Sequence, residues 1–279
     1  MTIIYILISL IIVLLLVLRK NDYFQDHCIV TLSSKKEFLI CLVLIGLSYT
    51  SIELQKIKAD NFTEFEIGSL NQAKINQINT FDRGITGRWD IRAKNNGKVF
   101  KNTSIYLIPF SLFLFAGSLK RRLVLFFIFS QGYVLTESLT GLAKGLVNRY
   151  RPFAYRTINE IETLNPEAKE KFLEDIVDYD ILNSFFSGDA SIIAFGFVFF
   201  AYSYSLFYKE RKYKNILWII ALIGVVLGCY YRTSSGKHFP TDVMIGAIVG
   251  FLVAFGILLI HKKSINLIEL KDKQLPTKN

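Results

Sequence analysis

The sequence predicts an all-α polytopic membrane bundle, and two observations lead to this fold class. Hydrophobic residues make up 52% of the 279 positions and charged residues only 20%, which is too apolar for an ordinary soluble domain. One apolar run could be a core helix of a soluble bundle, but seven indicate membrane spans. The seven runs are Thr2–Leu18, Phe38–Ile52, Thr103–Leu119, Leu123–Ala143, Ala190–Tyr208, Ile216–Tyr231 and Phe239–Ile260.

The charges that flank these runs predict the orientation of the chain. Arg19 and Lys20 close the first run without a small-residue cleavage site, so we expect a retained N-terminal helix rather than a removed signal. The short basic loops 120–122, 209–214 and 262–263 contain no other motif, and the positive-inside rule places them in the cytoplasm. The loop around His238 is then expected on the outer face.

The runs also divide the chain into three parts. We expect residues 1–36 to form a transmembrane helix and a cytoplasmic loop, residues 37–262 the membrane domain, and residues 263–279 a cytoplasmic tail. Two polar stretches of the membrane domain, 53–102 and 153–186, are expected outside the membrane on the His238 side.

Each polar stretch contains one notable segment. Residues 81–89 carry two aromatic and several basic side chains, which favours the lipid headgroup layer or an exposed loop with a surface helix. In the second stretch, Asn165 and Pro166 are typical of a helix start. The apolar side chains that follow would share one face of a short amphipathic helix, either a lid or a structural cover: Phe172, Leu173, Ile176 and Val177.

The formal net charge of +10 raises the question of the partner. The 33 Lys and Arg residues are scattered between apolar runs without a continuous basic segment, so anionic phospholipid is a more natural partner than nucleic acid. The cysteines Cys28, Cys41 and Cys229 show neither metal-ligand spacing nor a disulfide framework.

The stretch from Arg232 to Asp242 is a short segment with charged residues between two apolar runs. His238 should lie there at a membrane surface, where ionisable groups are usually functional. If the following helix begins near Pro240, His238 and Asp242 are four residues apart and can meet on one face. The carboxylate would hold one ring nitrogen and leave the other free to attack.

Two further segments supply groups that bind an anion. Lys144 and Arg151 are seven residues apart, so they would share one helix face if that helix continues until Pro152 ends it. Ser187 is a plausible N-cap, and Gly188 allows a backbone N–H to approach a ligand closely. Together with Arg232, these groups could surround a tetrahedral oxyanion beside His238, and such cationic side chains need no metal to neutralise it.

These three segments resemble the three-part signature of the type 2 phosphatidic acid phosphatase family, relatives of bacterial acid phosphatases and vanadium haloperoxidases. The matching elements, over about residues 38–260, are Lys144-x6-Arg151-Pro152, Ser187-Gly188 and Arg232-x5-His238-x3-Asp242. The resemblance implies a six-helix membrane core, here with one added N-terminal helix, and removal of phosphate from a lipid through a phosphohistidine. It also implies His238 as nucleophile, Asp242 as its partner, and phosphate binding by Lys144, Arg151, Ser187, Gly188 and Arg232.

The second part of the signature departs from the family. Asp189 stands where the family has a histidine that is thought to protonate the leaving group, and Tyr231 replaces a serine. Either Asp189 is the acid, or the leaving group needs none. The second option favours a lipid pyrophosphate or a sugar 1-phosphate as substrate, because the leaving groups of these compounds depart more readily than a plain alkoxide.

The leading hypothesis is therefore a lipid phosphatase of the bacterial cytoplasmic membrane, with its site facing the periplasm or the exterior. Candidate substrates are lipid A phosphate, undecaprenyl pyrophosphate and phosphatidylglycerophosphate. One alternative is a phosphotransferase that passes the phosphoryl group from His238 to a second lipid, and another is a lipid-binding homologue with weakened catalysis.

Overall fold

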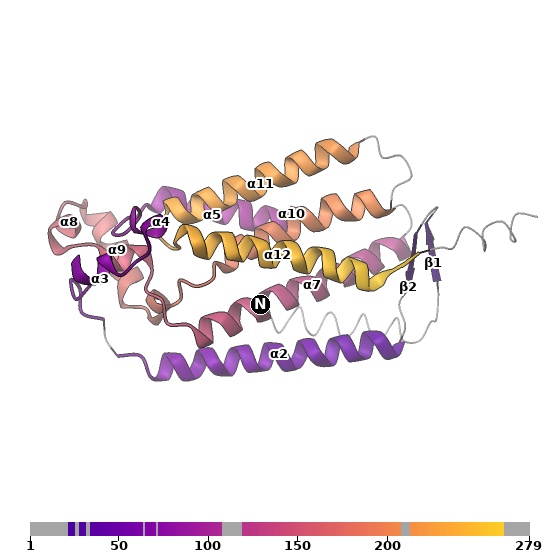
Figure 1. Ribbon diagram of the computed structural model, residues 1–279, viewed down its shortest axis with the longest axis horizontal. Helices are drawn as coiled ribbons and strands as arrows, with labels where there is room; N and C mark the ends of the chain where they lie inside the picture. Colours follow the sequence, from indigo (N-terminus) through magenta and orange to yellow (C-terminus); the bar gives the residue numbers. More distant parts are fainter. Residues whose placement is uncertain are drawn as a thin grey trace, which may run out of the picture.

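The computed structural model is an elongated bundle of long helices, with short helices gathered at one end and two short strands labelled at the other (Figure 1). It describes residues 22–25, 28–31, 34–63, 65–70, 72–107, 119–207 and 213–264. Within these residues, five helices are long and apolar enough to cross a membrane. They are α2 (Ser34–Asp60), α7 (Leu119–Leu146), α10 (Gly188–Phe207), α11 (Lys214–Ser234) and α12 (Pro240–His261).

These helices confirm the predicted multi-pass membrane bundle at five of the seven apolar runs. The predicted span Thr2–Leu18 and most of Thr103–Leu119 lie outside the described residues, as does the tail beyond residue 264. α2 is much longer than the run Phe38–Ile52, because its polar C-terminal turns continue as helix to Asp60.

A small sheet at the end opposite the short helices adds to the predicted all-α fold. Strands β1 (Asp22–Gln25), β2 (Cys28–Thr31) and β3 (Lys262–Ser264) pair antiparallel in the order β1-β2-β3. β2 precedes α2 and β3 follows α12 directly, so the sheet brings the segment before α2 together with the segment after α12. Patterning could not predict it, because each strand is only three or four residues long.

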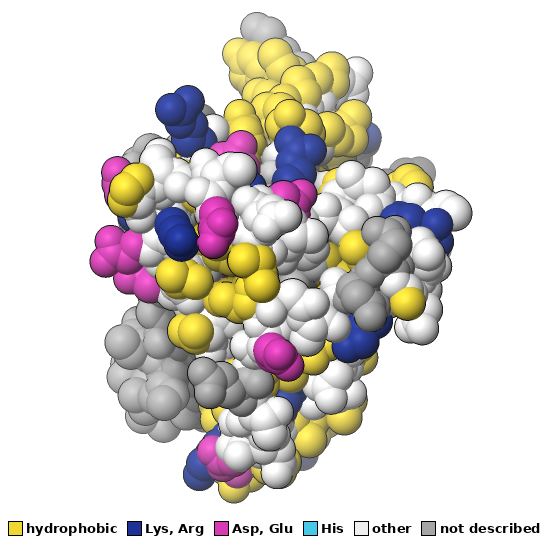
Figure 2. Space-filling view, turned by 90° about the vertical axis from the view of Figure 1, so that its left-hand side faces the viewer, with side chains coloured by type: hydrophobic (Ala, Val, Ile, Leu, Met, Phe, Trp, Pro, Cys, Tyr) yellow, Lys and Arg dark blue, Asp and Glu magenta, His cyan; other side chains and the backbone are white. Residues whose placement is uncertain are grey.

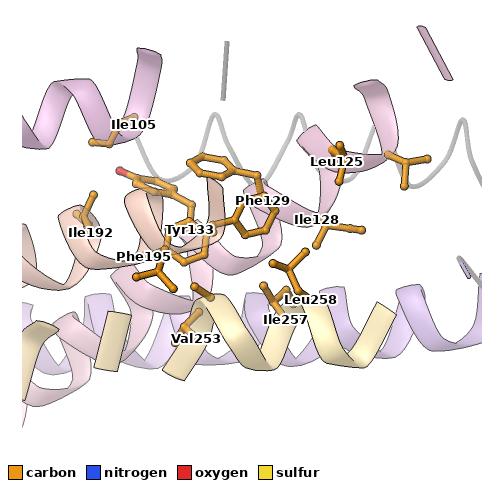
Figure 3. Close-up of a cluster of buried hydrophobic side chains, with 14 residues drawn as sticks. Ile105, Leu125, Ile128, Phe129, Tyr133, Ile192, Phe195, Val253, Ile257 and Leu258 are labelled. Atoms are coloured by element: carbon orange, nitrogen blue, oxygen red, sulfur yellow. The ribbon is translucent and has the colours of Figure 1, made fainter. Parts of the chain in front are cut away.

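The core of the bundle lies between α7, α10 and α12 (Figure 3). Phe129 from α7 packs against Phe195 and Phe199 from α10, with ring centroids 5.1 and 5.3 Å away. Gly246 and Gly250 allow α12 to approach α10 closely. A Cβ at Gly246 would lie 2.4 Å from the carbonyl oxygen of Ser187, the N-cap of α10, and a Cβ at Gly250 would lie 2.0 Å from that of Ser191. This contact fixes the start of α10 beside the start of α12.

The short elements form a second packed unit, the cap, at one end of the bundle (Figure 1). The N-cap Asn165 and Pro166 start α9 as predicted, and Phe172 and Ile176 are fully buried, whereas Val177 is 63% exposed. Phe172 packs edge-on against Trp89 and Phe153, so α9 serves at least as a structural cover. The cap contains α3 (Gln72–Asn76), α4 (Thr80–Arg83), η2 (Pro152–Tyr155), α8 (Ile158–Glu162), α9 (Pro166–Val177) and η3 (Tyr179–Leu182).

One further helix, α5 (Ile91–Asn102), runs from the cap along the bundle and continues into η1 (Thr103–Leu107), which has π-helical hydrogen bonding. It packs against α11 and α10. Asp90 caps its N-terminus by accepting hydrogen bonds from two backbone N–H groups.

Candidate active site

The predicted site residues converge where the bundle meets the cap. The end of α7, the start of α10, the end of α11 and the start of α12 all lie at this end (Figure 1). A turn centred on Gly236 links Arg232 to His238; its φ of +73° and a built Cβ 1.7 Å from the Arg88 carbonyl oxygen leave room only for glycine. Acidic and basic side chains are scattered over this end, and no histidine shows among its coloured atoms (Figure 2).

His238 is almost fully buried, with 1% of its surface exposed. Its Nδ1 lies 2.6 Å from the Ser184 carbonyl oxygen, and its Nε2 lies 3.2 Å from Nη1 of Arg151. A carbonyl oxygen only accepts hydrogen bonds, and a guanidinium only donates them. The ring is therefore neutral with its proton on Nδ1, and the lone pair on Nε2 points toward the arginine.

Burial and nearby cations keep this imidazole neutral. Burial has the largest effect and, together with the charges of Arg151, Arg232 and Lys144, lowers the pKa of His238 well below its ordinary value; the Ser184 hydrogen bond opposes this shift only in part. A neutral imidazole can act as a nucleophile, whereas an imidazolium cannot.

Asp242 forms no hydrogen bond with His238, and the sequence prediction of a direct pair is wrong. α12 begins at Pro240, so His238 precedes the helix and the four-residue spacing does not bring the two side chains together. Asp242 Oδ2 instead accepts hydrogen bonds from the Ser184 hydroxyl at 2.5 Å and the Phe239 N–H at 3.0 Å. Its other oxygen forms an ion pair with Arg149.

Arg151 is held in place by both backbone and side-chain oxygens. Its Nε donates to the Asp180 carbonyl at 2.8 Å, its Nη2 to the Asp180 carboxylate at 2.6 Å, and its Nη1 to the Lys237 carbonyl at 2.7 Å. Burial alone would raise the pKa of Asp180, but Arg151 and Lys144 lower it overall. The carboxylate thus stays ionised and orients the guanidinium toward His238.

The predicted helix from Lys144 to Arg151 is also wrong. α7 ends at Leu146, and the backbone of Arg149 and Arg151 pairs with residues 181–184 in an extended conformation. Lys58 stabilises this end of α7, because its ammonium donates to four oxygens, including the Lys144 and Val147 carbonyls at 2.7 and 2.9 Å. Lys144 still lies close enough to influence both His238 and Asp180 electrostatically.

Ser187 and Gly188 occupy the positions predicted for them at the start of α10. The Ser187 hydroxyl accepts a hydrogen bond from the Ala190 N–H at 3.4 Å, as an N-cap does. Ser187 N–H donates to the Asp242 carbonyl oxygen at 3.0 Å, which ties this turn to α12. A Cβ at Gly188 would lie 2.7 Å from Thr140, so the glycine also has a packing role.

Asp189 is paired with two cations. One carboxylate oxygen lies 2.8 Å from the Lys101 ammonium, and the other lies 3.0 Å from Nη1 of Arg232. Arg232 is 7% exposed and its Nε has no hydrogen-bond partner among the described residues. That buried, unpartnered donor is available to a phosphate oxygen.

Sequence reasoning missed several residues that support the site. Asp82, fully buried in α4, accepts from the Thr241 hydroxyl at 2.5 Å and from Arg149 at 2.7 Å. Asp175 of α9 pairs with Lys237 at 2.7 Å. Burial and the charge of Arg151 lower the pKa of Lys237 to about 8, although Asp175 opposes this. The segment 81–89 thus belongs to the site's support, and nothing in its local pattern indicated this.

Comparison with known protein families matches residues 121–266 to the PAP2 superfamily. The match spans just over half of the chain and contains all three signature segments. Searches of the curated proteins and of the solved structures return no match. The extent of the family match and the convergence of the three segments lead to one conclusion: this chain belongs to the PAP2 superfamily.

Proposed function

We propose that this protein is a membrane lipid phosphatase that works through a phosphohistidine on His238. PAP2 superfamily members are phosphatases, often of lipid phosphates. The observation that carries the proposal is the placement of the imidazole, with Nδ1–H on the Ser184 carbonyl and the Nε2 lone pair 3.2 Å from the Arg151 guanidinium. This arrangement presents a nucleophile beside a fixed positive charge.

The proposed reaction has two steps. His238 Nε2 attacks phosphorus in line, the bond from phosphorus to the lipid oxygen breaks, and the ring becomes a cation whose Nδ1–H stays on Ser184. Water then attacks the phosphohistidine and releases inorganic phosphate. Arg151, Arg232 and Lys144 would stabilise the charge on the equatorial oxygens in both steps.

A lipid substrate fits the placement of the site. The bundle helices end where His238, Arg151 and Arg232 lie, so a phosphate headgroup at the membrane surface would be at the level of these residues while its chains remain in the bilayer. Lipid A phosphate, undecaprenyl pyrophosphate and phosphatidylglycerophosphate are the proposed candidates. The outer face of the bacterial cytoplasmic membrane is the proposed location of the site.

The test is phosphate release from the purified protein over a panel of these lipids and phosphatidic acid. We expect release that His238→Gln abolishes, and a 32P-labelled protein species that is stable in base and labile in acid. Unchanged release by a folded His238→Gln variant would overturn the proposal.

The same assay separates the alternatives. A phosphotransferase would label a second lipid and release no phosphate when only one lipid is supplied. A lipid-binding homologue would retain the labelled lipid without forming a labelled protein.

A further inference from the structure

Lys101 reaches the site from outside the family-matched region 121–266. Its ammonium and the Arg232 guanidinium bind the two oxygens of one carboxylate, that of Asp189, at 2.8 and 3.0 Å. Asp189 stands where the family has a histidine. Asp189, the residue that departs from the family signature, and Lys101 are thus in direct contact.

The helix α5 fixes Lys101 at this place. Gly97, one turn before Lys101 on the same face, lies against Arg232, where a built Cβ would be 3.3 Å from the arginine Cδ. The Phe100 ring lies 5.7 Å from that of Tyr231, the residue before Arg232. α5 is therefore packed along the end of α11, and its lysine is directed at the start of α10.

The pairing argues against Asp189 as the proton donor. Each Asp189 oxygen accepts from a cation, and a carboxylate between two cations stays ionised and only accepts hydrogen bonds. The Lys101 ammonium carries three N–H groups, and one is enough for Asp189. The Lys101 side chain is 32% exposed, so its remaining donors have room for a ligand.

We propose that Lys101, oriented by Asp189, protonates the leaving group in place of the missing histidine. This rests on the proposed phosphatase function. As His238 Nε2 forms its bond to phosphorus, the bond to the lipid oxygen breaks, and that oxygen takes a proton from the Lys101 ammonium. In the second step the neutral amine takes a proton from the attacking water, and the ammonium is restored as phosphate leaves.

Substrates with different leaving groups test this role. Phosphatidic acid releases an alkoxide that needs a proton, whereas 4-nitrophenyl phosphate releases a phenolate that does not. For Lys101→Met we expect kcat/KM to fall about 100-fold or more on phosphatidic acid, the typical effect of losing a general acid, and less than about threefold on 4-nitrophenyl phosphate. Lys98→Met, an exposed lysine on the same helix, is the control and should change neither.

A lysine-to-arginine change separates proton transfer from charge. Lys101→Arg keeps a cation for Asp189, but a guanidinium does not release its proton at these pH values. We expect it to behave like Lys101→Met on phosphatidic acid. Full activity of Lys101→Arg, or equal losses on both substrates in Lys101→Met, would overturn the proton-donor role.

Restoring the family residue gives an independent test. In an Asp189→His background, the imidazole should protonate the leaving group, so adding Lys101→Met should cost less than tenfold on phosphatidic acid. An undiminished 100-fold loss in that background would count against the proposal. Failure of the phosphatase proposal itself looks different, because the unsubstituted protein would then release no phosphate from either substrate, or folded His238→Gln would keep its activity on both.

Discussion

His238 Nδ1 donates to the Ser184 carbonyl oxygen at 2.6 Å, and the hydroxyl of the same serine donates to Asp242 at 2.5 Å. Ser184 thus stands between the imidazole and the carboxylate that the family signature pairs with it. The backbone of one residue orients the ring, while its side chain secures the buried acid of α12.

Ser184→Ala keeps the carbonyl and removes the hydroxyl. We expect the free energy of unfolding to fall by about 1–3 kcal/mol, because buried Asp242 loses one donor, while kcat/KM falls less than tenfold. Thermal unfolding in detergent and phosphate-release kinetics measure the two effects. Complete inactivation at unchanged stability would show that the hydroxyl, rather than the carbonyl, is the essential group.

His238 should remain neutral well below pH 6.5, because burial and three cations lower its pKa. Histidine NMR of labelled protein, assigned with His238→Gln, should show an unchanged Nδ1–H tautomer from pH 7.5 to 5.5. The unfolded chain binds this proton near pH 6.5 and the folded chain does not. The contribution of the neutral, buried His238 to the free energy of unfolding is therefore complete above pH 6.5 and is lost as the pH falls below that value. Titration of the His238 signal near 6.5 would contradict this.

Arg151→Lys should lower kcat/KM about 100-fold on every phosphate substrate. The guanidinium bonds simultaneously to Asp180, the Lys237 carbonyl and His238, and an ammonium on a shorter, unforked chain cannot reproduce that set. Arg156→Lys is the control, because this arginine lies in the same cap but its guanidinium contacts the Glu160 carbonyl and the Phe172 ring rather than the site. Comparable losses in both variants would indicate general damage to the cap.

Lys58→Met should destabilise the protein by about 2–4 kcal/mol, because it removes the ammonium that joins two carbonyl oxygens at the end of α7 to oxygens of Leu182 and Asn183. The exposed Lys56→Met, on the same helix, should change the unfolding temperature little. Thermal unfolding of both variants is the measurement. Equal unfolding temperatures for the two would show that water replaces the ammonium.

Phe172→Ala should open the cap, since its fully buried ring contacts Trp89 and Phe153, with an expected cost of about 3–5 kcal/mol. Leu173→Ala, at a neighbouring position that is 36% exposed, should cost far less. Limited proteolysis should cut residues 153–186 faster in Phe172→Ala alone. Equal cutting in both variants would show that this ring does not hold the cap closed.

The sequence by itself determined the features that depend on local pattern. The lengths of the apolar runs predicted five helices that the structure confirms, and Asn165, Ser187 and Pro240 marked helix starts because capping involves neighbouring residues. The order and spacing of the three signature segments identified the residues that now lie together around His238.

Only the tertiary structure decided which buried charged and polar groups pair. The partners Lys101 with Asp189, Asp82 with Arg149, and Ser184 with His238 are 54 or more residues apart and come from separate elements. A buried charge or polar group takes whichever complementary group the packing brings within reach, since leaving it unpaired is costly. Helix spacing therefore suggested the wrong partner for His238, and packing of the cap and α5 on the bundle supplied the observed ones.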